Sequence, residues 1–307
     1  MKNTLIVVIA LLIVGGLAYF FLQSNNVQTP IETVPTVDTT TTPEVQQQPE
    51  VTPPVQEETV PPTEIIGTSA GDHDIVAYHY GSGDKEILFV GGIHGGYEWN
   101  TSLVAYQLMD YLKATPEAIP AGVKVTVIPV LNPDGLNKVI GTTDRFTRAD
   151  IPTSLNATIP GRFNANTVDL NRNFDCDWQA KGTWQNTTVS GGGAAFSEPE
   201  SQAIRDYVSA HAISAAIVWY SAAGGVYASN CHNGILPETT TLTDLYAKAS
   251  GYKAYEEFDF YALTGDMVNW LAKKNIPAIS VLLTTHEDTE WTKNLAGIKA
   301  ILTHYAQ

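Results

Sequence analysis

The sequence predicts an α/β fold, in which a mixed or mostly parallel sheet carries helices on both of its faces. Two observations lead to this prediction. Short apolar runs of strand length alternate along the chain with segments whose apolar residues recur at helical spacing. Polar motifs also follow several of these runs directly, and sheets of this class bind ligands beyond the carboxyl ends of their strands. We therefore expect the functional groups at that edge of the sheet.

Five segments are expected to form strands, because they are short, apolar and bounded by turn residues. They are DIVAYHY (74–80), EILFVGG (86–92), VKVTVIPV (123–130), ISAAIVWYS (213–221) and PAISVLLT (277–284). After the third of these, NPDG (132–135) is expected to form a turn, followed by a long loop over roughly 136–196.

Helices are expected between these strands. The first starts at Glu98. SEPE (197–200) predicts a second helix start, with Ser197 as the N-cap and Glu200 as its capping-box partner. Further helices are expected near 240–250, at 265–274 and in the closing segment TEWTKNLAGIKAILTHY (289–305).

The chain before the predicted sheet has two parts. Residues 4–22 carry no charge and are long enough to span a bilayer as a helix. We expect an uncleaved anchor, because the run ends in bulky residues; the alternative is a signal peptide and a secreted domain. Lys2 would keep residues 1–3 in the cytoplasm and leave the rest outside. Residues 23–63, rich in Thr, Pro, Gln and Glu, are expected to be a disordered tether, and residues 64–307 one domain.

Composition narrows the classes of partner. The chain has 17 Lys and Arg against 32 Asp and Glu, a formal net charge of −15. This excess argues against nucleic acid as a partner, because phosphates are neutralised by Lys and Arg. Cys176 and Cys231 are the two cysteines. They are too few for a disulfide scaffold or a structural zinc knot, and one bridge or two separate buried thiols remain open.

One motif with metal-binding chemistry follows a predicted strand. In GGIHGGYEWN (91–100), His94 and Glu98 are an imidazole and a carboxylate that can face one metal ion. The alternative is a histidine in a glycine-rich turn and a glutamate in the first turn of a helix, where the helix dipole favours it.

A second motif gathers two arginines. RFNANTVDLNRNF (162–174) places Arg162, Asn171 and Arg172 in one short segment. Arginine forks bind carboxylates in a bidentate manner, so the segment predicts an anion pocket. An ion-paired surface loop is the alternative.

These motifs, taken in order, resemble the zinc metallocarboxypeptidase family. The order is a His–Glu pair after a strand, then NPDG, then R-x-N-x-N-x-VDLNRNF, then SEPE. The bacterial members that trim peptides or cell-wall peptides are the most similar, and the resemblance covers most of residues 64–307. It implies a mixed eight-stranded sheet flanked by helices, one zinc ion, and hydrolysis at the C-termini of peptides.

The resemblance implies roles on the metal side, with two departures. His94 and Glu98 match the first two zinc ligands, separated by three residues where the family usually has two, and Arg162 matches the arginine that stabilises the oxyanion. The position of the third ligand holds Tyr220, and that of the catalytic glutamate holds Leu282. Catalytic zinc needs three protein ligands, and loss of a general base typically costs on the order of 10²–10⁴ in rate. Zinc occupancy and catalysis are therefore expected to be impaired.

On the substrate side the resemblance finds the family's residues in place. Asn171 and Arg172 match the pair that clamps the terminal carboxylate, and Tyr261 matches the mobile tyrosine that caps the bound C-terminal residue. Val268 lies near the position that sets the family's side-chain pocket. A neutral residue there would disfavour a strongly basic C-terminal residue.

Residues beyond the two departures are candidates to replace the missing groups. Glu287 or Glu290 would be the substitute base, and His286 and His232 are further candidates. Solvated loop residues, or charges that favour a helix start, are the alternative for each.

Three functions follow as hypotheses. The first is a zinc carboxypeptidase that acts on the C-termini of peptides or cell-wall peptides outside the membrane, to which the N-terminal helix attaches it. The second is a catalytically inactive module that binds peptide C-termini. The third, a purely structural surface protein, is disfavoured by the density of site-like residues.

Overall fold

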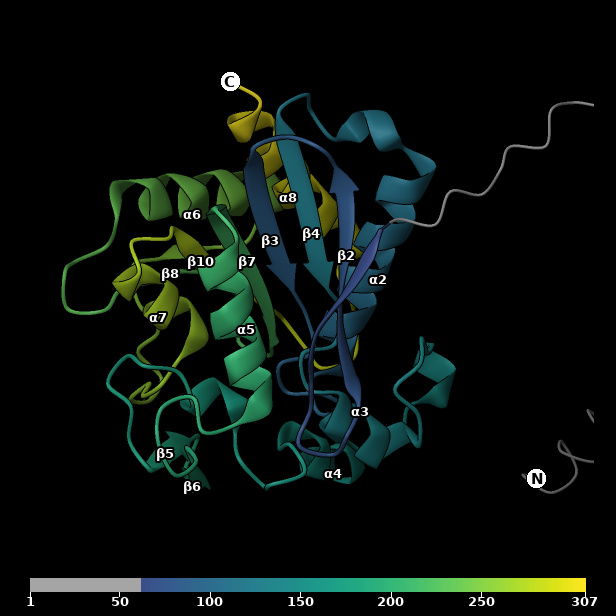
Figure 1. Cartoon of the computed structure of the whole chain (residues 1–307), viewed down its shortest axis with the longest axis vertical. Helices are drawn as coiled ribbons and strands as arrows, with labels where there is room; N and C mark the ends of the chain where they lie inside the picture. The colour runs from purple at the N-terminus through teal and green to yellow at the C-terminus, as the bar shows by residue number, and fades with distance from the viewer. Residues whose placement is uncertain (1–61) are drawn as a thin grey trace, which may run out of the picture. The chain divides into compact units, whose positions relative to one another are not determined.

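The computed structural model describes residues 62–307 (Figure 1). Eight strands form one sheet in the order β1-β2-β4-β3-β7-β10-β8-β9. Their bounds are β1 (Thr63–Thr68), β2 (Asp74–Gly81), β3 (Lys85–Val90), β4 (Val123–Ile128), β7 (Ile213–Ser221), β8 (Gly225–Ala228), β9 (Ala254–Tyr255) and β10 (Ala278–Leu283). The four central strands β4, β3, β7 and β10 are parallel, whereas β2 and β8 pair with them in the antiparallel sense.

Helices cover both faces of this sheet, which confirms the predicted mixed, mostly parallel fold. One core contains side chains of α2, α6 and α8, and the other contains side chains of α5 and α7. Strand β3 serves both cores by alternation, with Ile87 and Phe89 in the first and Leu88 and Val90 in the second. The helices are α2 (Trp99–Ala114), α3 (Pro133–Ile140), α4 (Leu155–Thr158), α5 (Pro199–Ala210), α6 (Pro237–Ser250), α7 (Met267–Lys273) and α8 (Trp291–Tyr305).

Two local predictions were wrong. The NPDG segment starts helix α3, because the Asn132 side chain accepts a hydrogen bond from Gly135 N at 2.8 Å and caps the helix. The expected loop 136–196 therefore contains most of α3, together with α4 and the hairpin of β5 (Lys181–Trp184) and β6 (Thr187–Ser190).

The SEPE helix also starts later than predicted. Helix α5 begins at Pro199, whose missing N–H costs nothing in the first turn. Glu198 is the N-cap, and Ser197 donates its hydroxyl to the Glu198 carboxylate at 2.7 Å, so Ser197 is not the N-cap. Glu200 makes no capping box, because its carboxylate accepts from Ala70 N instead.

The predicted anchor 4–22 and nearly all of the predicted tether 23–63 lie outside the described residues. Strand β1 begins at Thr63, one residue before the predicted start of the domain. No helix formed by residues 62–307 combines the length and the apolar character needed to cross a bilayer.

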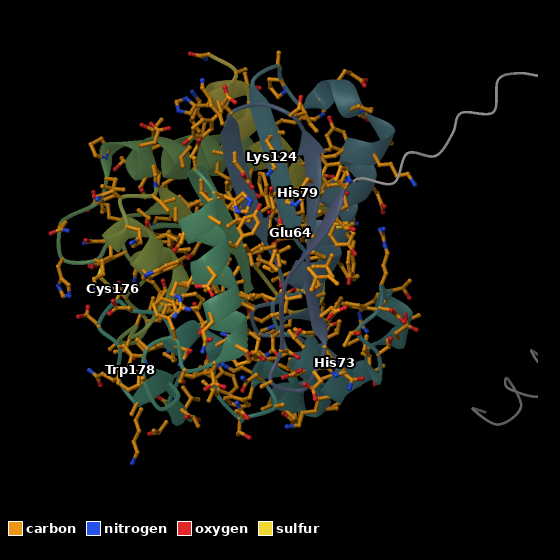
Figure 2. The ribbon with its side chains drawn as sticks, viewed as in Figure 1. Glu64, His73, His79, Lys124, Cys176 and Trp178 are labelled. Carbon is orange, nitrogen blue, oxygen red and sulfur yellow. A yellow bond between two sulfur atoms is a disulfide. The ribbon has the colours of Figure 1, made fainter. Side chains whose placement is uncertain are left out.

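A disulfide joins Cys176 to Cys231 across 55 residues of sequence. Cys176 and Trp178 both belong to the loop that follows RFNANTVDLNRNF (Figure 2). Two backbone hydrogen bonds tie this loop to the start of α7: Phe174 N donates to Gly265 O at 3.0 Å, and Gly265 N donates to Cys176 O at 2.7 Å. Of the two alternatives for the cysteines, the structure has the single bridge.

Removing this bridge should destabilise the domain. The double variant Cys176→Ser, Cys231→Ser is expected to lower the free energy of unfolding by about 4 kcal/mol, because a closed loop of this length no longer restricts the unfolded chain. Urea unfolding of oxidised wild type and of the variant measures the difference, with reduced wild type as the control. Equal midpoints for the oxidised wild type and the variant would contradict the expectation.

A buried carboxylate links α5 to two loops. Glu200 accepts hydrogen bonds from Ala70 N and from Asn164 Nδ2, both at 3.1 Å. Its side chain is fully buried, and burial, with the nearby Asp134 carboxylate, raises the pKa of Glu200 to about 7. The folded protein therefore binds a proton here at pH values where the unfolded chain has released it.

This proton gives stability a pH dependence with a defined sign. Because the pKa is higher in the folded state, the free energy of unfolding should fall as pH rises from about 4.5 to about 7, by on the order of 1–3 kcal/mol. Glu200→Gln should flatten this part of the profile, and Glu257→Gln, at an exposed site, should not. Denaturant titrations between pH 4 and pH 8 test it; parallel profiles for wild type and Glu200→Gln would refute it.

Candidate functional site

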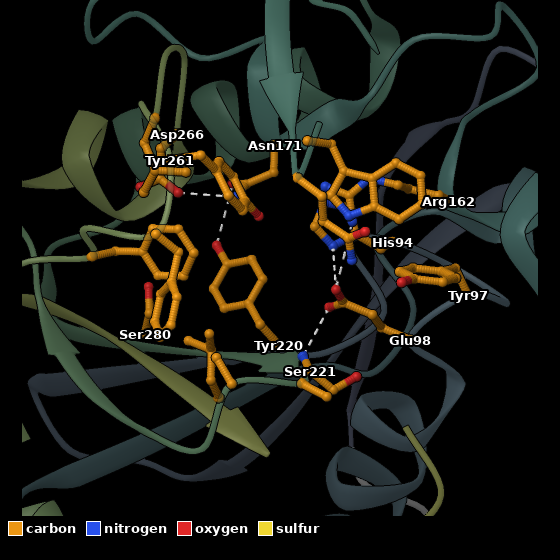
Figure 3. A pocket seen from close by; sticks show the side chains of 18 of the residues that line it. His94, Tyr97, Glu98, Arg162, Asn171, Tyr220, Ser221, Tyr261, Asp266 and Ser280 are labelled. Atoms are coloured by element: carbon orange, nitrogen blue, oxygen red, sulfur yellow. Dashed lines mark hydrogen bonds and ion pairs between the residues drawn. The ribbon is translucent and has the colours of Figure 1, made fainter. Parts of the chain in front are cut away.

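A cavity of about 380 Å³ lies beyond the carboxyl ends of the parallel strands (Figure 3). The segment after β3 contributes His94 and Glu98, β7 ends in Tyr220 and Ser221, and β10 contributes Leu282. The sequence predicted functional groups at this edge of the sheet, and the structure brings them together there.

A glycine-rich turn between β3 and α2 positions His94 and Glu98. Gly95 has a positive φ of 42°, and a Cβ there would lie 2.7 Å from Gly161 O and 2.8 Å from Asn132 O, so only glycine fits. Glu98 precedes α2 at its N-cap position, but its side chain makes no capping hydrogen bond. Its carboxylate is thereby left to face the cavity.

Four buried ionic side chains form a network on this side of the cavity. His94 Nδ1 lies 2.9 Å from Glu98 Oε1, and His94 Nε2 lies 3.2 Å from Asp169 Oδ1. Arg162 donates through Nε and Nη2 to Asp169 Oδ2 at 2.9 and 2.8 Å, and its Nη1 lies 3.6 Å from Glu98 Oε1. None of the four residues is more than 3% exposed.

The charges of this network support one another. Burial by itself would raise the pKa of Glu98, but His94 and Arg162 outweigh it and hold that pKa below its usual range. The same two neighbours hold the pKa of Asp169 well below its usual range against a large effect of burial. Both carboxyl groups are therefore ionised at neutral pH, and Glu98 Oε2 also accepts from Ser221 N at 3.1 Å.

The imidazole is close to Glu98 without being hydrogen bonded to it. Asp169 is an acceptor only, so His94 Nε2 carries the proton of that contact. Nδ1 has no aligned hydrogen-bond partner within the described part of the chain, although Glu98 Oε1 is 2.9 Å away. Nδ1 and the Glu98 carboxylate are therefore the two groups in this network that could donate to a metal ion.

Tyr220 does not complete that site. Its ring lies beside His94, with 5.9 Å between the ring centroids, but its hydroxyl points away and contacts Asn171 Oδ1 at 3.3 Å (Figure 3). Burial raises the pKa of Tyr220 well above its ordinary value, and a metal ligand must be deprotonated.

Leu282 pairs directly with Tyr220 in the parallel ladder of β7 and β10, so the two departures from the family pattern are neighbours. Between residues 62 and 307 no group of three His, Cys, Asp or Glu is placed to hold a metal ion. Because His94 and Glu98 are two donors and catalytic zinc requires three, the residues present do not fit a catalytic zinc site.

The second arginine, Arg172, has a different environment from Arg162. It lines the cavity and is 1% exposed. It donates through Nε and Nη2 to Thr183 O at 3.2 and 2.7 Å, and through Nη1 to Asn171 O at 2.7 Å. No carboxylate of the described chain lies within ion-pair distance of it. Two of its five N–H groups are left without a protein acceptor among residues 62–307.

Asn171 lines the cavity, but the protein already engages most of its amide. Its Oδ1 accepts from Met267 N at 3.1 Å and from the Tyr220 hydroxyl, and its Nδ2 donates to Asp266 Oδ2 at 2.9 Å. Asp266 is the N-cap of α7 and accepts from Asn269 N at 3.0 Å. Asn171 therefore joins the cavity wall to α7.

The aromatic residues of the cavity pack on the two arginines. The Arg162 guanidinium carbon lies 4.5 Å from the centroid of the Trp184 ring and 5.7 Å from that of Tyr97. The corresponding carbon of Arg172 lies 5.7 Å from the ring centroid of Tyr261. Tyr261 was predicted to cover the clamp, and the structure places it beside Arg172.

Of the four residues proposed to replace the third zinc ligand and the catalytic base, three lie outside the cavity. Glu287 forms an exposed ion pair with Arg148, and Glu290 accepts from Thr284 N and the Tyr252 hydroxyl, both at 2.7 Å, before α8. Neither glutamate lines the cavity.

The two histidines named as replacements differ from each other. His232 pairs with Asp177 at the surface. His286 does line the cavity, where its Nδ1 lies 3.0 Å from Ser221 Oγ, and burial lowers its pKa.

Val268 does not line the cavity, because its side chain is buried in the core against the sheet. The prediction of specificity from Val268 was therefore based on the wrong residue. Asp266, two positions earlier, lines the cavity instead.

Sequence reasoning missed three residues of the cavity region. Asp169 lies inside the VDLNRNF block, where an acid between two apolar residues was the available signal. Asp266 is followed three residues later by Asn269 at the start of a helix, which is an N-cap pattern. Trp184 belongs to a strand inside the segment predicted as loop, and no signal pointed to it.

Comparisons with known proteins find relatives of this chain in sequence and in fold. A curated relative, the gamma-D-glutamyl-L-diamino acid endopeptidase 1 of Lysinibacillus sphaericus, is 26% identical over 217 residues, which are 64% of this chain and 54% of that protein. The chain thus spans about half the length of this relative.

Two solved structures share the fold. The carboxypeptidase A of Helicoverpa armigera has a TM-score of 0.60 at 20% identity, over 80% of this chain and 68% of the other. The murein-tripeptide amidase MpaA of Escherichia coli O157 has a TM-score of 0.56 at 18% identity, over 82% of this chain and 96% of the other.

A family model supplies the assignment. The model described as zinc carboxypeptidase matches residues 62–295, which is more than half of the chain and includes every cavity residue named above. The matched residues include all eight strands of the sheet and all residues that line the cavity. The chain belongs to the zinc carboxypeptidase family.

Proposed function

We propose that this domain binds the C-terminal carboxylate of a peptide and does not hydrolyse the peptide through zinc. One observation carries the proposal: Arg172 is a buried guanidinium in the cavity wall that has no carboxylate partner among residues 62–307. A buried cation without a counter-ion is costly. A ligand carboxylate would supply that counter-ion and accept the two remaining N–H groups in a bidentate contact.

The other arginine has no such capacity. Arg162 is already neutralised by Asp169, and Glu98 lies nearby. Its guanidinium is held in place by charge and by the Trp184 ring, so its remaining N–H groups are suited to orient the backbone of a bound peptide. Tyr261, beside Arg172, would cover the bound carboxylate and exclude water from it.

The residues at the positions of the family's zinc ligands and catalytic glutamate favour binding over hydrolysis. Two ligands remain where three are needed, and Leu282 cannot accept a proton from a water molecule. The first hypothesis, a zinc carboxypeptidase, remains the alternative. It is supported by the His94–Glu98 pair, by Arg162 and the Asn171–Arg172 pair in the same cavity, and by membership of the family.

The names of the similar proteins suggest a class of peptide. One is an endopeptidase for gamma-D-glutamyl-L-diamino acid bonds and another is a murein-tripeptide amidase. We therefore propose the C-termini of cell-wall peptides as the ligands. The disulfide supports an oxidising compartment, outside the cytoplasm, in which such peptides occur.

Loss of the unpaired arginine should weaken recognition of the carboxylate. Arg172→Ala is expected to weaken binding of a free-carboxylate peptide by about 10- to 100-fold, as for loss of hydrogen bonds to a charged group. Calorimetry measures the affinity. Arg205→Ala, which removes an exposed arginine paired with Asp206, is the matched control and should bind as wild type does.

The wild-type protein gives an independent measurement of the same contact. A peptide that ends in a carboxamide should bind more weakly than the same peptide with a free carboxylate, by a similar factor. Equal affinity of both peptides, or unchanged affinity of Arg172→Ala, would remove the basis of the proposal.

The metal content of the purified protein separates the two functions. We expect much less than one zinc ion per chain after dialysis, and no change in Tm on addition of zinc or of a chelator, because two donors hold the ion weakly. Elemental analysis and thermal unfolding measure both, with His94→Ala as the control for any residual binding. One zinc ion per chain together with release of C-terminal residues would establish the alternative.

A further inference from the structure

We propose that His286 accepts a backbone N–H group of the bound peptide through its Nε2 atom. A ligand that lacks this N–H group, because a proline or an ester bond stands at that position, then binds more weakly. The inference rests on the proposed binding of a peptide C-terminus at Arg172, and it adds a residue that selects for the peptide backbone.

The orientation of one buried amide decides where the protons lie. Asn100 is fully buried in the first turn of α2, and its Nδ2 donates to Thr285 O at 2.8 Å and to Asp288 O at 3.0 Å. Both partners are backbone carbonyl groups, which only accept hydrogen bonds. The other end of the amide, Oδ1, therefore faces Ser221 and accepts from it.

The proton positions follow along this row of contacts. Ser221 has a single hydroxyl proton, and its Oγ lies 3.0 Å from Asn100 Oδ1 and 3.0 Å from His286 Nδ1. Because Asn100 Oδ1 has no proton to give, Ser221 donates to it. The contact between Ser221 and His286 then takes its proton from Nδ1. His286 is thus the tautomer that has its proton on Nδ1 and a lone pair on Nε2.

Nε2 is the ring nitrogen that remains for a ligand. The imidazole of His286 lines the cavity, and its Nε2 makes no hydrogen bond to any residue between 62 and 307. Burial lowers the pKa of His286, so the ring is neutral at neutral pH and Nε2 keeps its lone pair. The cavity wall therefore has an unused hydrogen-bond acceptor at this point.

Arg162 supplies the opposite capacity close by. The guanidinium carbon of Arg162 lies 5.7 Å from the centroid of the Tyr97 ring, and the centroid of the His286 ring lies 4.6 Å from the same point. Arg162 only donates hydrogen bonds, whereas the neutral Nε2 of His286 only accepts them. A peptide backbone has both C=O acceptors and N–H donors, so it can satisfy both residues.

Two alternatives for His286 make different predictions. Its ring could serve only to hold the loop after β10 against Ser221, with Nε2 in contact with water. The carboxylate of Glu98, which also lines the cavity, could accept the N–H group of the ligand instead. Substitutions that replace one ring nitrogen of His286 at a time distinguish these alternatives from the proposal.

The first measurement uses wild-type protein and peptides with a free C-terminal carboxylate. In each peptide one of the three C-terminal amide bonds is replaced by an ester, which removes one N–H group and keeps the length of the chain. Calorimetry should show one position at which the ester weakens binding by about tenfold, as for a buried acceptor that loses its partner. An equal, small effect at all three positions would overturn the inference.

Two variants separate the ring nitrogens of His286. In His286→Asn the side-chain nitrogen takes the place of Nδ1 and still donates to Ser221, but nothing replaces Nε2. In His286→Gln the side-chain oxygen takes the place of Nε2, but the donor to Ser221 is lost. We expect His286→Asn to reduce the ester effect at the sensitive position to that of the other positions, and His286→Gln to retain most of it.

The comparison between variants isolates the N–H group. An ester also weakens the adjacent carbonyl as an acceptor, but this effect is common to all variants and cancels in the difference. If His286 only holds its loop, or if Glu98 is the acceptor, His286→Asn would keep the full ester effect, which would overturn the inference. His232→Asn, which changes an exposed histidine paired with Asp177, is the matched control and should keep the wild-type ratio.

The tautomer has a measurement of its own. NMR of protein with isotope-labelled histidine reports which ring nitrogen carries the proton, and comparison with His286→Asn identifies the signals of His286. Nδ1 should be protonated in the free protein, and the Nε2 signal should shift when the amide peptide binds. A proton on Nε2 in the free protein would contradict the proposed acceptor.

The outcomes for the two proposals separate. Equal binding of an all-amide peptide with a C-terminal carboxamide and with a free carboxylate would overturn the proposed function. Preference for the free carboxylate, with ester effects that do not depend on His286, would overturn the present inference alone. The wild-type comparison of amide and ester peptides stands even if a variant of His286 fails to fold.

Discussion

The buried carboxylate of Asp169 is the contact on which the cavity depends. One oxygen meets His94 Nε2 and the backbone N–H of Asn171, and the other accepts two hydrogen bonds from Arg162. A single side chain thus fixes the imidazole, the first arginine and the loop that carries the second arginine. Its low pKa keeps it charged throughout the physiological range. Its loss would leave a buried guanidinium unpaired, which typically costs about 3–5 kcal/mol.

The fold gives Arg162 and Arg172 different roles. The sequence placed Arg162 and Arg172 together in one motif, and only the family resemblance assigned them different roles. Folding gives Arg162 an internal counter-ion and leaves Arg172 with backbone carbonyl partners alone. The first arginine therefore belongs to the framework of the cavity, whereas the second keeps its electrostatic attraction for an external anion.

The sequence could predict the features that depend on interactions between residues close in the chain, and not those that depend on contacts between distant segments. Periodic patterns act locally, so the five predicted strands, β2, β3, β4, β7 and β10, and the long helices were predictable, as was the clustering of motifs at the strand ends. The pairing of Tyr220 with Leu282 depends on strand register, which local patterns do not contain. Glu287 and Glu290 are near Leu282 in sequence, but the chain turns away after β10 and surface partners take both carboxylates. The prediction for Val268 was wrong because the rotation of α7 points its side chain into the core. Asp266, which precedes the helix, lines the cavity instead.

Because Tyr220 and Leu282 are adjacent, substitutions at the two positions are coupled. Because the two side chains are direct neighbours on one face of the sheet, each fills space beside the other, and packing couples their identities. Restoring a histidine alone gives a third ligand without a base, and restoring a glutamate alone places an unpaired carboxylate against a phenol. The family pattern would therefore be reproduced only by two substitutions, one at each of these paired positions.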